Sequence, residues 1–393
     1  MLKSILQITN LFLILIFISA SGLAQENLLV NKLNDVILPV LTLKPDSAFD
    51  DIDFLAETLR GKEIIALGEV THGTKEIYAY KDRLIRYLVS RLGYKNIAFE
   101  ADYNGLETLD KYINGQIKEA AMSPNYKPLL EWLKSYNETK STDNRVHIYG
   151  LEMREFKPAI EKVLAANKGL DRADQEILLK ILRTPFDKIE KADLDEFRDV
   201  CTHLPAALEQ KMLIQLIDNY YNFIGRAVKI GVRDAFMADN AIAIKETSND
   251  KKLIIWAHNG HVAKTSLYKQ PAMGKFLSQR YGVGYYVIAT DINKGNVMVR
   301  KFIAKNKPVS DPQSIYFPEV NTSKGYEYYF KQCRYQNFIL DVRTAIATEP
   351  LKSFLTTPRE MRMIGALSSP VNKKLSIGGN FDMVVYFNQS NSL

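Results

Sequence analysis

The sequence predicts an α/β fold, with a mainly parallel sheet, flanking helices and an inserted all-helical subdomain. Short apolar runs recur along the chain, each bounded by polar residues, as in strands that are buried on both faces. Helical apolar spacing fills the segments between the first runs, and strands that alternate with helices are typical of a parallel sheet. The 393 residues are 46% apolar and 25% charged, which excludes a disordered or collagen-like protein.

The first 24 residues are predicted to be a secretory signal peptide. Lys3 gives a positive start, residues 11–18 form an unbroken apolar run, and the small residues Gly22 and Ala24 precede a cleavage site. A membrane anchor is the competing interpretation, but the run is shorter than the about 20 residues that span a bilayer. We therefore expect an exported protein, periplasmic or secreted, without a stable membrane anchor after cleavage.

Six apolar runs are expected to form the strands. Between the first two, residues 74–92 carry apolar side chains at helical spacing and end at Gly93, which indicates a helix. The tail from Phe381 alternates between apolar and polar residues and is expected to be a closing strand. The six runs are residues 64–67, 97–99, 146–149, 253–257, 285–289 and 338–340.

A long helical segment interrupts this alternation. Residues 156–246 are helical in pattern throughout, so we expect an inserted subdomain that acts as a lid over the substrate. The predicted organisation is a signal peptide (1–24), a first part of the α/β catalytic core (25–155), the helical insertion (156–246) and a second part of the core (247–393). Residues 305–328 hold three prolines and few periodic apolar residues, which indicates a long loop.

Charge and cysteine content narrow the possible functions. The net charge is +7, but the basic residues are spread out, whereas nucleic-acid binders concentrate them, so no nucleic-acid partner is expected. The two cysteines, Cys201 and Cys333, provide neither a disulfide framework nor a cysteine-based zinc site. Glycine motifs for nucleotides or dinucleotides are absent from the sequence, so no such cofactor is expected. The oligomeric state stays open.

Ionisable residues follow the predicted strands. Because ligands of a parallel sheet bind beyond the carboxyl ends of its strands, these side chains are expected to line one cleft. His72 follows Glu69 by three residues, so Glu69 could orient the His72 ring and leave its other nitrogen free as a general base. The competing interpretation is that such residues only cap the next helix or lie in an ordinary loop. The residues that follow strands are Glu69, Glu100, Glu152, His258 and His261.

Three interpretations of this cluster remain open. In the first, a His–Glu pair activates water for hydrolysis without a metal, and cationic residues hold the oxyanion. In the second, three histidines and several carboxylates bind a divalent metal such as zinc or manganese. In the third, a non-catalytic protein uses the cleft to bind a glycan or lipid. A serine nucleophile is disfavoured, because the sequence has no Gly-x-Ser-x-Gly segment.

Five segments resemble the erythromycin esterase family, in the family's order. The first is Ala-Leu-Gly-Glu-Val-Thr-His-Gly-Thr-Lys-Glu at 66–76, and the others are residues 97–102, 150–153, 233–240 and 257–261. This resemblance implies an α/β fold with a helical insertion. It also implies an esterase that opens macrolide lactone rings by hydrolysis, and thus a link to macrolide antibiotic resistance.

The resemblance further implies roles for the matching residues. His72 would be the general base that activates water, Glu69 would support it, and Glu100 would complete the acidic pair. His258 and His261 would line the same cleft, and one of them would polarise the carbonyl or protonate the leaving oxygen. We therefore expect an exported hydrolase of carboxylic esters or lactones, with a small-molecule substrate and no organic cofactor.

The sequence departs from the family at one cationic position. The family places an arginine nine residues after the histidine, where this chain has Lys81, with Arg83 two residues further on. Lysine keeps the charge but lacks the planar fork that binds an oxyanion with two hydrogen bonds. We expect Lys81, Arg83 or Arg233 to stabilise the oxyanion, and Glu152 to line the substrate site.

Overall fold

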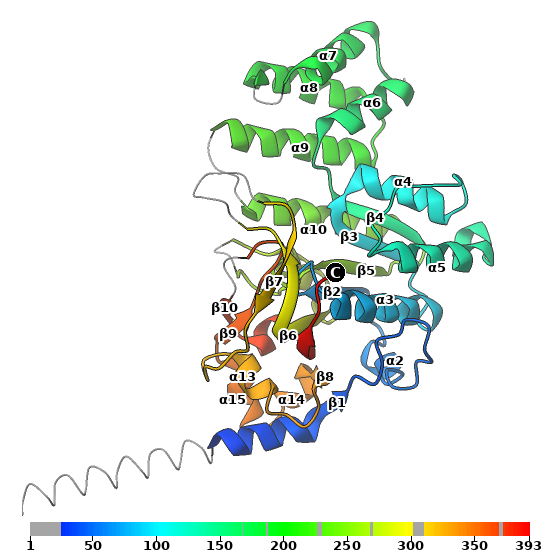
Figure 1. Cartoon of the computed structure of the whole chain (residues 1–393). Coiled ribbons are helices and arrows are strands. Elements are labelled where there is room, and N and C mark those ends of the chain that lie inside the picture. The colour runs from blue at the N-terminus through cyan, green and yellow to red at the C-terminus, as the bar shows by residue number, and fades with distance from the viewer. Residues whose placement is uncertain are drawn as a thin grey trace, which may run out of the picture. The chain divides into compact units, whose positions relative to one another are not determined.

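The structure is a computed structural model that describes residues 25–166, 168–185, 188–225, 230–267, 270–301, 310–368 and 372–393. The predicted signal peptide lies outside the described residues. The chain divides into two compact units (Figure 1). Of the described residues, those within 25–43, 70–77 and 288–393 form unit 1, and those within 44–69 and 78–287 form unit 2.

Four parallel strands form the sheet of unit 2, in the order β2-β5-β3-β4. Strands β2 and β5 are buried over their whole length, which is why their sequences are nearly continuous apolar runs. Glu69 and His258 are register partners at the ends of these two strands. The strands are β2 (Ile64–Glu69), β3 (Asn96–Asp102), β4 (His147–Glu152) and β5 (Leu253–His258).

Strands β3 and β4 approach each other so closely that one position must be glycine. A Cβ atom on Gly150 would lie 2.6 Å from the backbone of Asp102 and of Tyr103. Asp102 also ends β3 as the N-cap of the next helix, because its side chain accepts the backbone N–H of Gly105. The strand end is thereby fixed beside Glu152 of β4.

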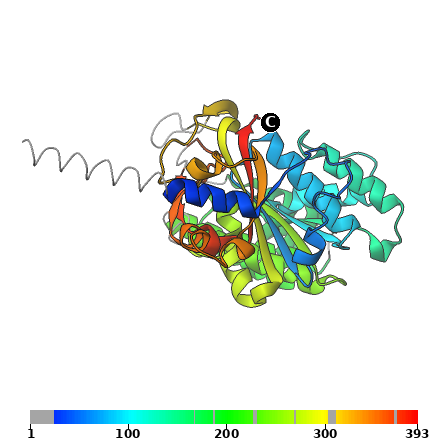
Figure 2. The same ribbon diagram turned by 90° about the horizontal axis from the view of Figure 1, so that it is seen from below.

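Helices lie on both sides of the strands of unit 2, as Figure 2 shows with α3 on one side and α10 and α12 on the other. Leu84, Ile85 and Leu88 of α3 are fully or almost fully buried, which confirms the helix expected from the spacing of apolar residues. Outside the insertion, the helices with residues in this unit are α2 (Leu55–Thr58), α3 (Lys75–Ser90), α4 (Tyr103–Ile113), α5 (Lys127–Glu138), α11 (Asn259–Val262) and α12 (Met273–Tyr281), with 3-10 turns at Thr142–Asn144 and Gly282–Gly284.

In the described part of the chain, five helices lie between β4 and β5 and form the inserted helical region, which confirms the prediction of a helical insertion. They share a core of their own, which includes Phe156, Leu178 and Phe197. Helix α9 packs on α10, and α10 in turn contacts β4, β3 and β5 (Figure 1). The five are α6 (Phe156–Ala166), α7 (Arg172–Arg183), α8 (Lys191–His203), α9 (Leu208–Gly225) and α10 (Ile230–Thr247). None of the helices in the described part of the chain is long and apolar enough to cross a membrane.

Unit 1 has a mixed sheet with the order β1-β8-β11-β6, and β7 pairs with β6. Strands β11 and β6 are parallel, and the other pairs are antiparallel. The strands are β1 (Ile37–Pro39), β6 (Tyr285–Val299), β7 (Gln313–Phe317), β8 (Asn337–Asp341) and β11 (Met383–Ser390), with β9 (Arg359–Arg362) and β10 (Asn372–Leu375) as a separate pair. The helices are α13 (Tyr326–Phe330), α14 (Val342–Ala345), α15 (Leu351–Thr356) and α16 (Ile377–Asn380).

The predicted α/β class with a mostly parallel sheet is confirmed, but the expected long loop at 305–328 is wrong where the structure describes it. Strand β7 and the start of α13 lie in this segment. Three of the five side chains of β7 are exposed, so the strand lacks the burial on both faces that marks the strands of unit 2. Residues 305–309 lie outside the described residues.

Candidate active site

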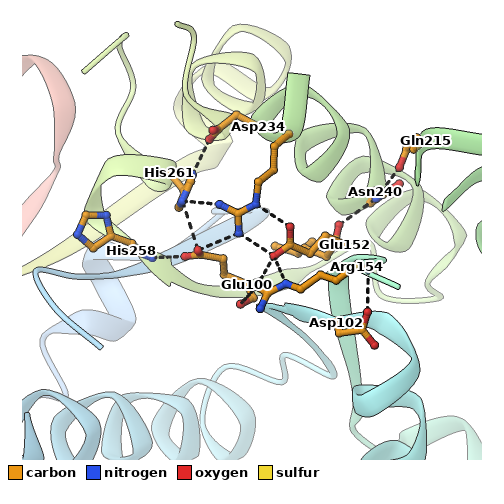
Figure 3. A network of polar contacts seen from close by, with 11 residues as sticks. Glu100, Asp102, Glu152, Arg154, Gln215, Asp234, Asn240, His258 and His261 are labelled. Carbon is orange, nitrogen blue, oxygen red and sulfur yellow. Dashed lines mark hydrogen bonds and ion pairs between the residues drawn. The ribbon is translucent and has the colours of Figure 1, made fainter. Parts of the chain in front are cut away.

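Charged residues from the strand ends of unit 2 meet helix α10 in one network (Figure 3). Glu100 comes from β3, Glu152 from β4 and His258 from β5. His261 follows in the short helix α11, and Arg233 comes from α10. The expectation that Glu100, Glu152, His258 and His261 lie at one edge of the sheet therefore holds for their positions, and Arg233 joins them.

Arg233 is bound mainly by Glu152. Its Nε donates to Glu152 Oε2 at 2.6 Å and its Nη2 to Glu152 Oε1 at 2.7 Å, while Nη2 also donates to Glu100 Oε1 at 3.1 Å. Burial opposes the charge on Arg233, but Glu152 and Glu100 raise its pKa above the ordinary value. Burial likewise disfavours the Glu152 carboxylate, and Arg233 with Arg154 lowers its pKa overall. The pair is thus a fully charged, two-bond contact.

His261 lies between two carboxylates. Its Nδ1 is 2.8 Å from Asp234 Oδ1, and its Nε2 is 3.3 Å from Glu100 Oε1. Burial lowers the pKa of His261, but Glu100 and Asp234 outweigh burial and raise it to about 10. The ring is therefore an imidazolium at neutral pH. Since both nitrogens then donate, the 3.1 Å approach of Arg233 Nη1 to Nε2 is not a hydrogen bond in that state.

His258 contacts the same network through its backbone. Its N–H donates to Glu100 Oε2 at 2.9 Å, so both oxygens of Glu100 are engaged. Its Nδ1 accepts the backbone N–H of Gly260 at 3.1 Å and caps α11. A neutral His258 ring therefore carries its proton on Nε2.

Glu69 has a buried cation and an indole as partners. Its Oε2 accepts Lys81 Nζ at 2.9 Å and Trp256 Nε1 at 2.7 Å. Lys81 Nζ also lies 4.2 Å from the centre of the Trp256 ring. Burial lowers the pKa of Lys81 to about 8, although Glu69 favours the charged form. Lys81 is fully buried, and its ammonium group neutralises Glu69 in this conformation. The sequence suggested instead that Lys81 contacts the substrate.

The remaining predicted residues have contacts of their own. Arg83 is fully buried, and its guanidinium donates to both oxygens of Asp51 and to the carbonyl of Ala48. His72 belongs to unit 1, where its backbone N–H donates to the carbonyl of Gly365 at 3.4 Å. His147, which we expected in a strand, contacts Asp110 at 3.1 Å.

The structure adds residues that the sequence did not single out. Asp234 orients His261, Trp256 binds Glu69, and Arg154 donates to Glu152 Oε1 at 2.8 Å and to the carbonyl of Glu100 at 3.3 Å. The sequence does indicate the position of Trp256. It lies two residues before His258 on β5, and side chains two residues apart in a strand point to the same face. For Asp234, the only indication in the sequence is that it directly follows Arg233.

A metal ion needs several donor side chains that converge on one point. Among the residues that the structure describes, no group of three or more His, Cys, Asp or Glu side chains is arranged to hold one. In the network itself, the cation that the carboxylates of Glu100 and Glu152 surround is the Arg233 guanidinium. Cys201 and Cys333 are each free and buried.

The fold and the network define the class. This is an α/β protein whose parallel strands bring histidine, carboxylate and arginine side chains to one edge, the set that enzymes use for hydrolysis by acid–base catalysis. A family model described as erythromycin esterase matches residues 89–390. The chain belongs to this family of hydrolases, as the sequence resemblance suggested.

Individual relatives are distant. The erythromycin esterase type II of Escherichia coli is 20% identical over 352 residues, which are 74% of this chain and 80% of that protein. A crystal structure of a Bacillus cereus protein has a TM-score of 0.81 at 21% identity and covers 93% of this chain and 98% of its own. An erythromycin esterase variant in its open conformation has a TM-score of 0.68 at 18% identity, with 90% and 97% covered. At these identities the structural likeness shows the fold alone.

Proposed function

We propose that the protein hydrolyses a carboxylic ester or a lactone, with water as the nucleophile. The observation that carries the proposal is the protonated His261, held between Glu100 and Asp234 beside Arg233. Fixed positive donors at a strand edge stabilise the negative charge that develops on a carbonyl oxygen during attack by water. Their geometry is set before substrate arrives, so little reorganisation is needed during the reaction.

The general base must be a different group. His261 already holds its proton at neutral pH, because its pKa is raised to about 10 by Glu100 and Asp234 against the effect of burial. Nδ1 of His258 is occupied by the N–H of Gly260. We assign the base to His72 because it follows Glu69 by three residues, and we assign Glu69 as the residue that orients it. Lys81 and Trp256 fix the Glu69 carboxylate for this role.

The proposed reaction balances without any further reactant. His72 takes a proton from water while the water oxygen bonds to the carbonyl carbon, and the oxyanion forms near Arg233 and His261. The bond between the carbonyl carbon and the leaving oxygen then breaks, and the His261 imidazolium protonates that oxygen through Nε2–H, while Nε2–H of the neutral His258 polarises the carbonyl. His72 then releases its proton to solvent and His261 takes one up, which restores the starting state. The products are a carboxylic acid and an alcohol, which stay in one molecule if the substrate is a lactone.

Two further features belong to this proposal. The family supports a macrolide lactone as the first substrate to test, with the helical insertion at 156–246 as a lid. The composition of residues 1–24 supports export and cleavage before Gln25. Sequencing the N-terminus of the protein after expression with its full leader tests the second feature, and an intact Met1 would contradict it.

The test of hydrolysis uses purified residues 25–393 with a panel of macrolide lactones and simple esters. Mass spectrometry detects the gain of one water, and His72→Ala is expected to lose about two to four orders of magnitude in rate. His147→Ala is the matched control, because His147 contacts Asp110 outside the network. Turnover close to that of the wild type in His72→Ala would exclude His72 as the base. No water gain on any ester would contradict the proposed function.

A further inference from the structure

A cavity of about 450 Å³ opens in unit 2 between the end of β4 and helices α6 and α7. Five of the residues that line it are apolar, and four of these, Phe156, Ile160, Ile181 and Ile189, are buried. Its size lies within the range of about 300–1,000 Å³ that is usual for small-molecule sites. The other four lining residues are charged or polar. The apolar part of the lining favours an occupant with an apolar body, because burial of apolar surface is the main driving force.

One residue joins this cavity to the active-site network. Arg154 lines the cavity, and its Nε donates to Glu152 Oε1 at 2.8 Å while Nη2 donates to the carbonyl of Glu100 at 3.3 Å. Figure 3 shows Arg154 beside Glu152 and Glu100. Half of the Arg154 side chain is exposed, so the residue stands at the mouth of the cavity rather than in its floor. A molecule seated in the cavity would therefore extend toward the carboxylates that bind Arg233.

The charged residues that line the cavity do not favour a charged ligand. Arg154 is already paired with Glu152 and Lys157 with Glu161, at 4.0 Å, while the third charged lining residue, Glu155, is negative. No unpaired cation is thus offered to an anionic head group by these three residues. The chemistry of the cavity suits a neutral, apolar chain or ring with its polar end directed outward.

We infer that this cavity between β4, α6 and α7 binds the apolar body of an ester substrate while the ester group reaches the network of Glu100, Glu152 and Arg233. The inference rests on the proposed function and names its substrate class, which is a neutral ester or lactone with a substantial hydrophobic part. Short, polar esters leave the cavity empty and lose this binding energy.

Two tryptophan substitutions on α7 test the assignment. Leu182 is half-buried and lines the cavity, whereas Ile177 is half-buried on the same helix and is not among the lining residues. Leu182→Trp fills the cavity, so the ratio of kcat/KM for p-nitrophenyl decanoate to that for p-nitrophenyl acetate is expected to fall at least about tenfold. Ile177→Trp is expected to keep the ratio of the wild type. An unchanged ratio in Leu182→Trp overturns the inference.

A binding experiment separates this inference from the proposed function. N-phenyl-1-naphthylamine, a neutral dye that brightens in apolar surroundings, is expected to bind the wild type and Ile177→Trp, with at least about tenfold weaker binding to Leu182→Trp. Displacement by 1-decanol supports a site for apolar chains. Equal dye binding by all three proteins overturns the inference even if esters are hydrolysed. If Leu182→Trp loses dye binding and Ile177→Trp keeps it, the inference is supported, whether or not p-nitrophenyl esters are turned over. A lack of ester turnover would count against the proposed function only.

Discussion

Asp234 Oδ1 lies 2.8 Å from Nδ1 of His261 and also accepts the backbone N–H of Met273 at 2.9 Å. One carboxylate therefore fixes the histidine ring and links α10 to the start of α12. Because α10 is the last helix of the insertion, the orientation of His261 is coupled to the segment that we propose as a lid. Asp234 acts through His261, as a positioning residue.

Asp234→Asn is expected to lower the pKa of His261 from about 10 and to reduce kcat. A histidine pKa that is raised in the folded state adds stability that is complete below the ordinary value of about 6.5 and disappears as the pH rises through the folded value. The stability lost in Asp234→Asn is thus larger at pH 6 than near pH 10.5. NMR titration of the ring protons gives the pKa, and urea unfolding at the two pH values gives the stabilities.

His203 and Asp174 provide the matched control for this prediction. Asp174 lies 3.0 Å from His203 Nδ1 in the insertion, and hydrogen bonding to Asp174 raises the pKa of that histidine as well. Asp174→Asn should lower the pKa of His203 and leave kcat unchanged. If the two substitutions reduce kcat equally, the coupling of Asp234 to the reaction is refuted.

Lys81→Met is expected to destabilise the fold strongly. The substitution leaves Glu69 buried without its cation, and removal of one partner of a buried ion pair typically costs about 3–5 kcal/mol. Lys75→Met, at an exposed position of the same helix, should change the free energy of unfolding by less than about 0.5 kcal/mol. Denaturant unfolding measures both variants. Equal stabilities would mean that the Lys81–Glu69 pair contributes nothing to folding.

Arg233→Lys keeps the positive charge and removes the planar guanidinium group that donates several hydrogen bonds at once. A lysine cannot make both hydrogen bonds to Glu152 and the further bond to Glu100. We expect a loss of about 10- to 100-fold in kcat with little change in the unfolding midpoint. Arg198→Lys, at the partly exposed pair with Asp218, should retain full activity. Wild-type kcat in Arg233→Lys would show that only the positive charge matters.

Glu327 in unit 1 is expected to make the free energy of unfolding fall as the pH rises. A surface acid that is paired with a cation has the opposite effect, because its pKa is lowered on folding. Burial raises the pKa of Glu327 to about 7 and raises that of the neighbouring Asp291 as well, while Arg362 opposes both shifts. The folded state then binds more protons than the unfolded state between about pH 4.5 and 7, so stability falls as the pH rises through this window.

Glu327→Gln stays neutral and keeps the acceptor for the Arg362 N–H, which is 2.6 Å from Glu327 Oε1. Its stability relative to the wild type should therefore increase from pH 4 to pH 8, as measured by urea unfolding. Glu138→Gln, at an exposed position of α5, is the control, with no such trend expected. A difference that is constant over this range would contradict protonation of Glu327.

The sequence was a good guide to the strands and to their ends. Strands buried on both faces carry an apolar signal that is local in the chain, so β2, β3, β4 and β5 were found at nearly correct places. Parallel strands end at the same edge, so Glu100, Glu152 and His258 could be grouped without a structure. The same argument fails for β7, because a strand with mostly exposed side chains resembles a loop.

Residues whose role depends on packing between distant elements were harder to place. Nothing local shows that Lys81 faces Trp256 inside the protein while Lys75 of the same helix faces solvent. Asp234 meets His261 only because α10 returns from the insertion to the strands. Arg83 was expected at the substrate and lies instead against Asp51, since the direction of a helical side chain follows from which face of the helix is covered.

The network that surrounds Arg233 balances its charges. Glu100, Glu152 and Asp234 contribute three negative groups, and Arg233, Arg154 and the protonated His261 contribute three positive ones. The formal charge of +7 counts every histidine as neutral, so the protonated His261 brings the chain to +8, and this surplus is carried by other regions. An uncharged ligand that approaches this network meets little net field, so its association should be nearly independent of ionic strength. Added salt would act instead on the charged residues elsewhere in the chain, which carry the positive surplus.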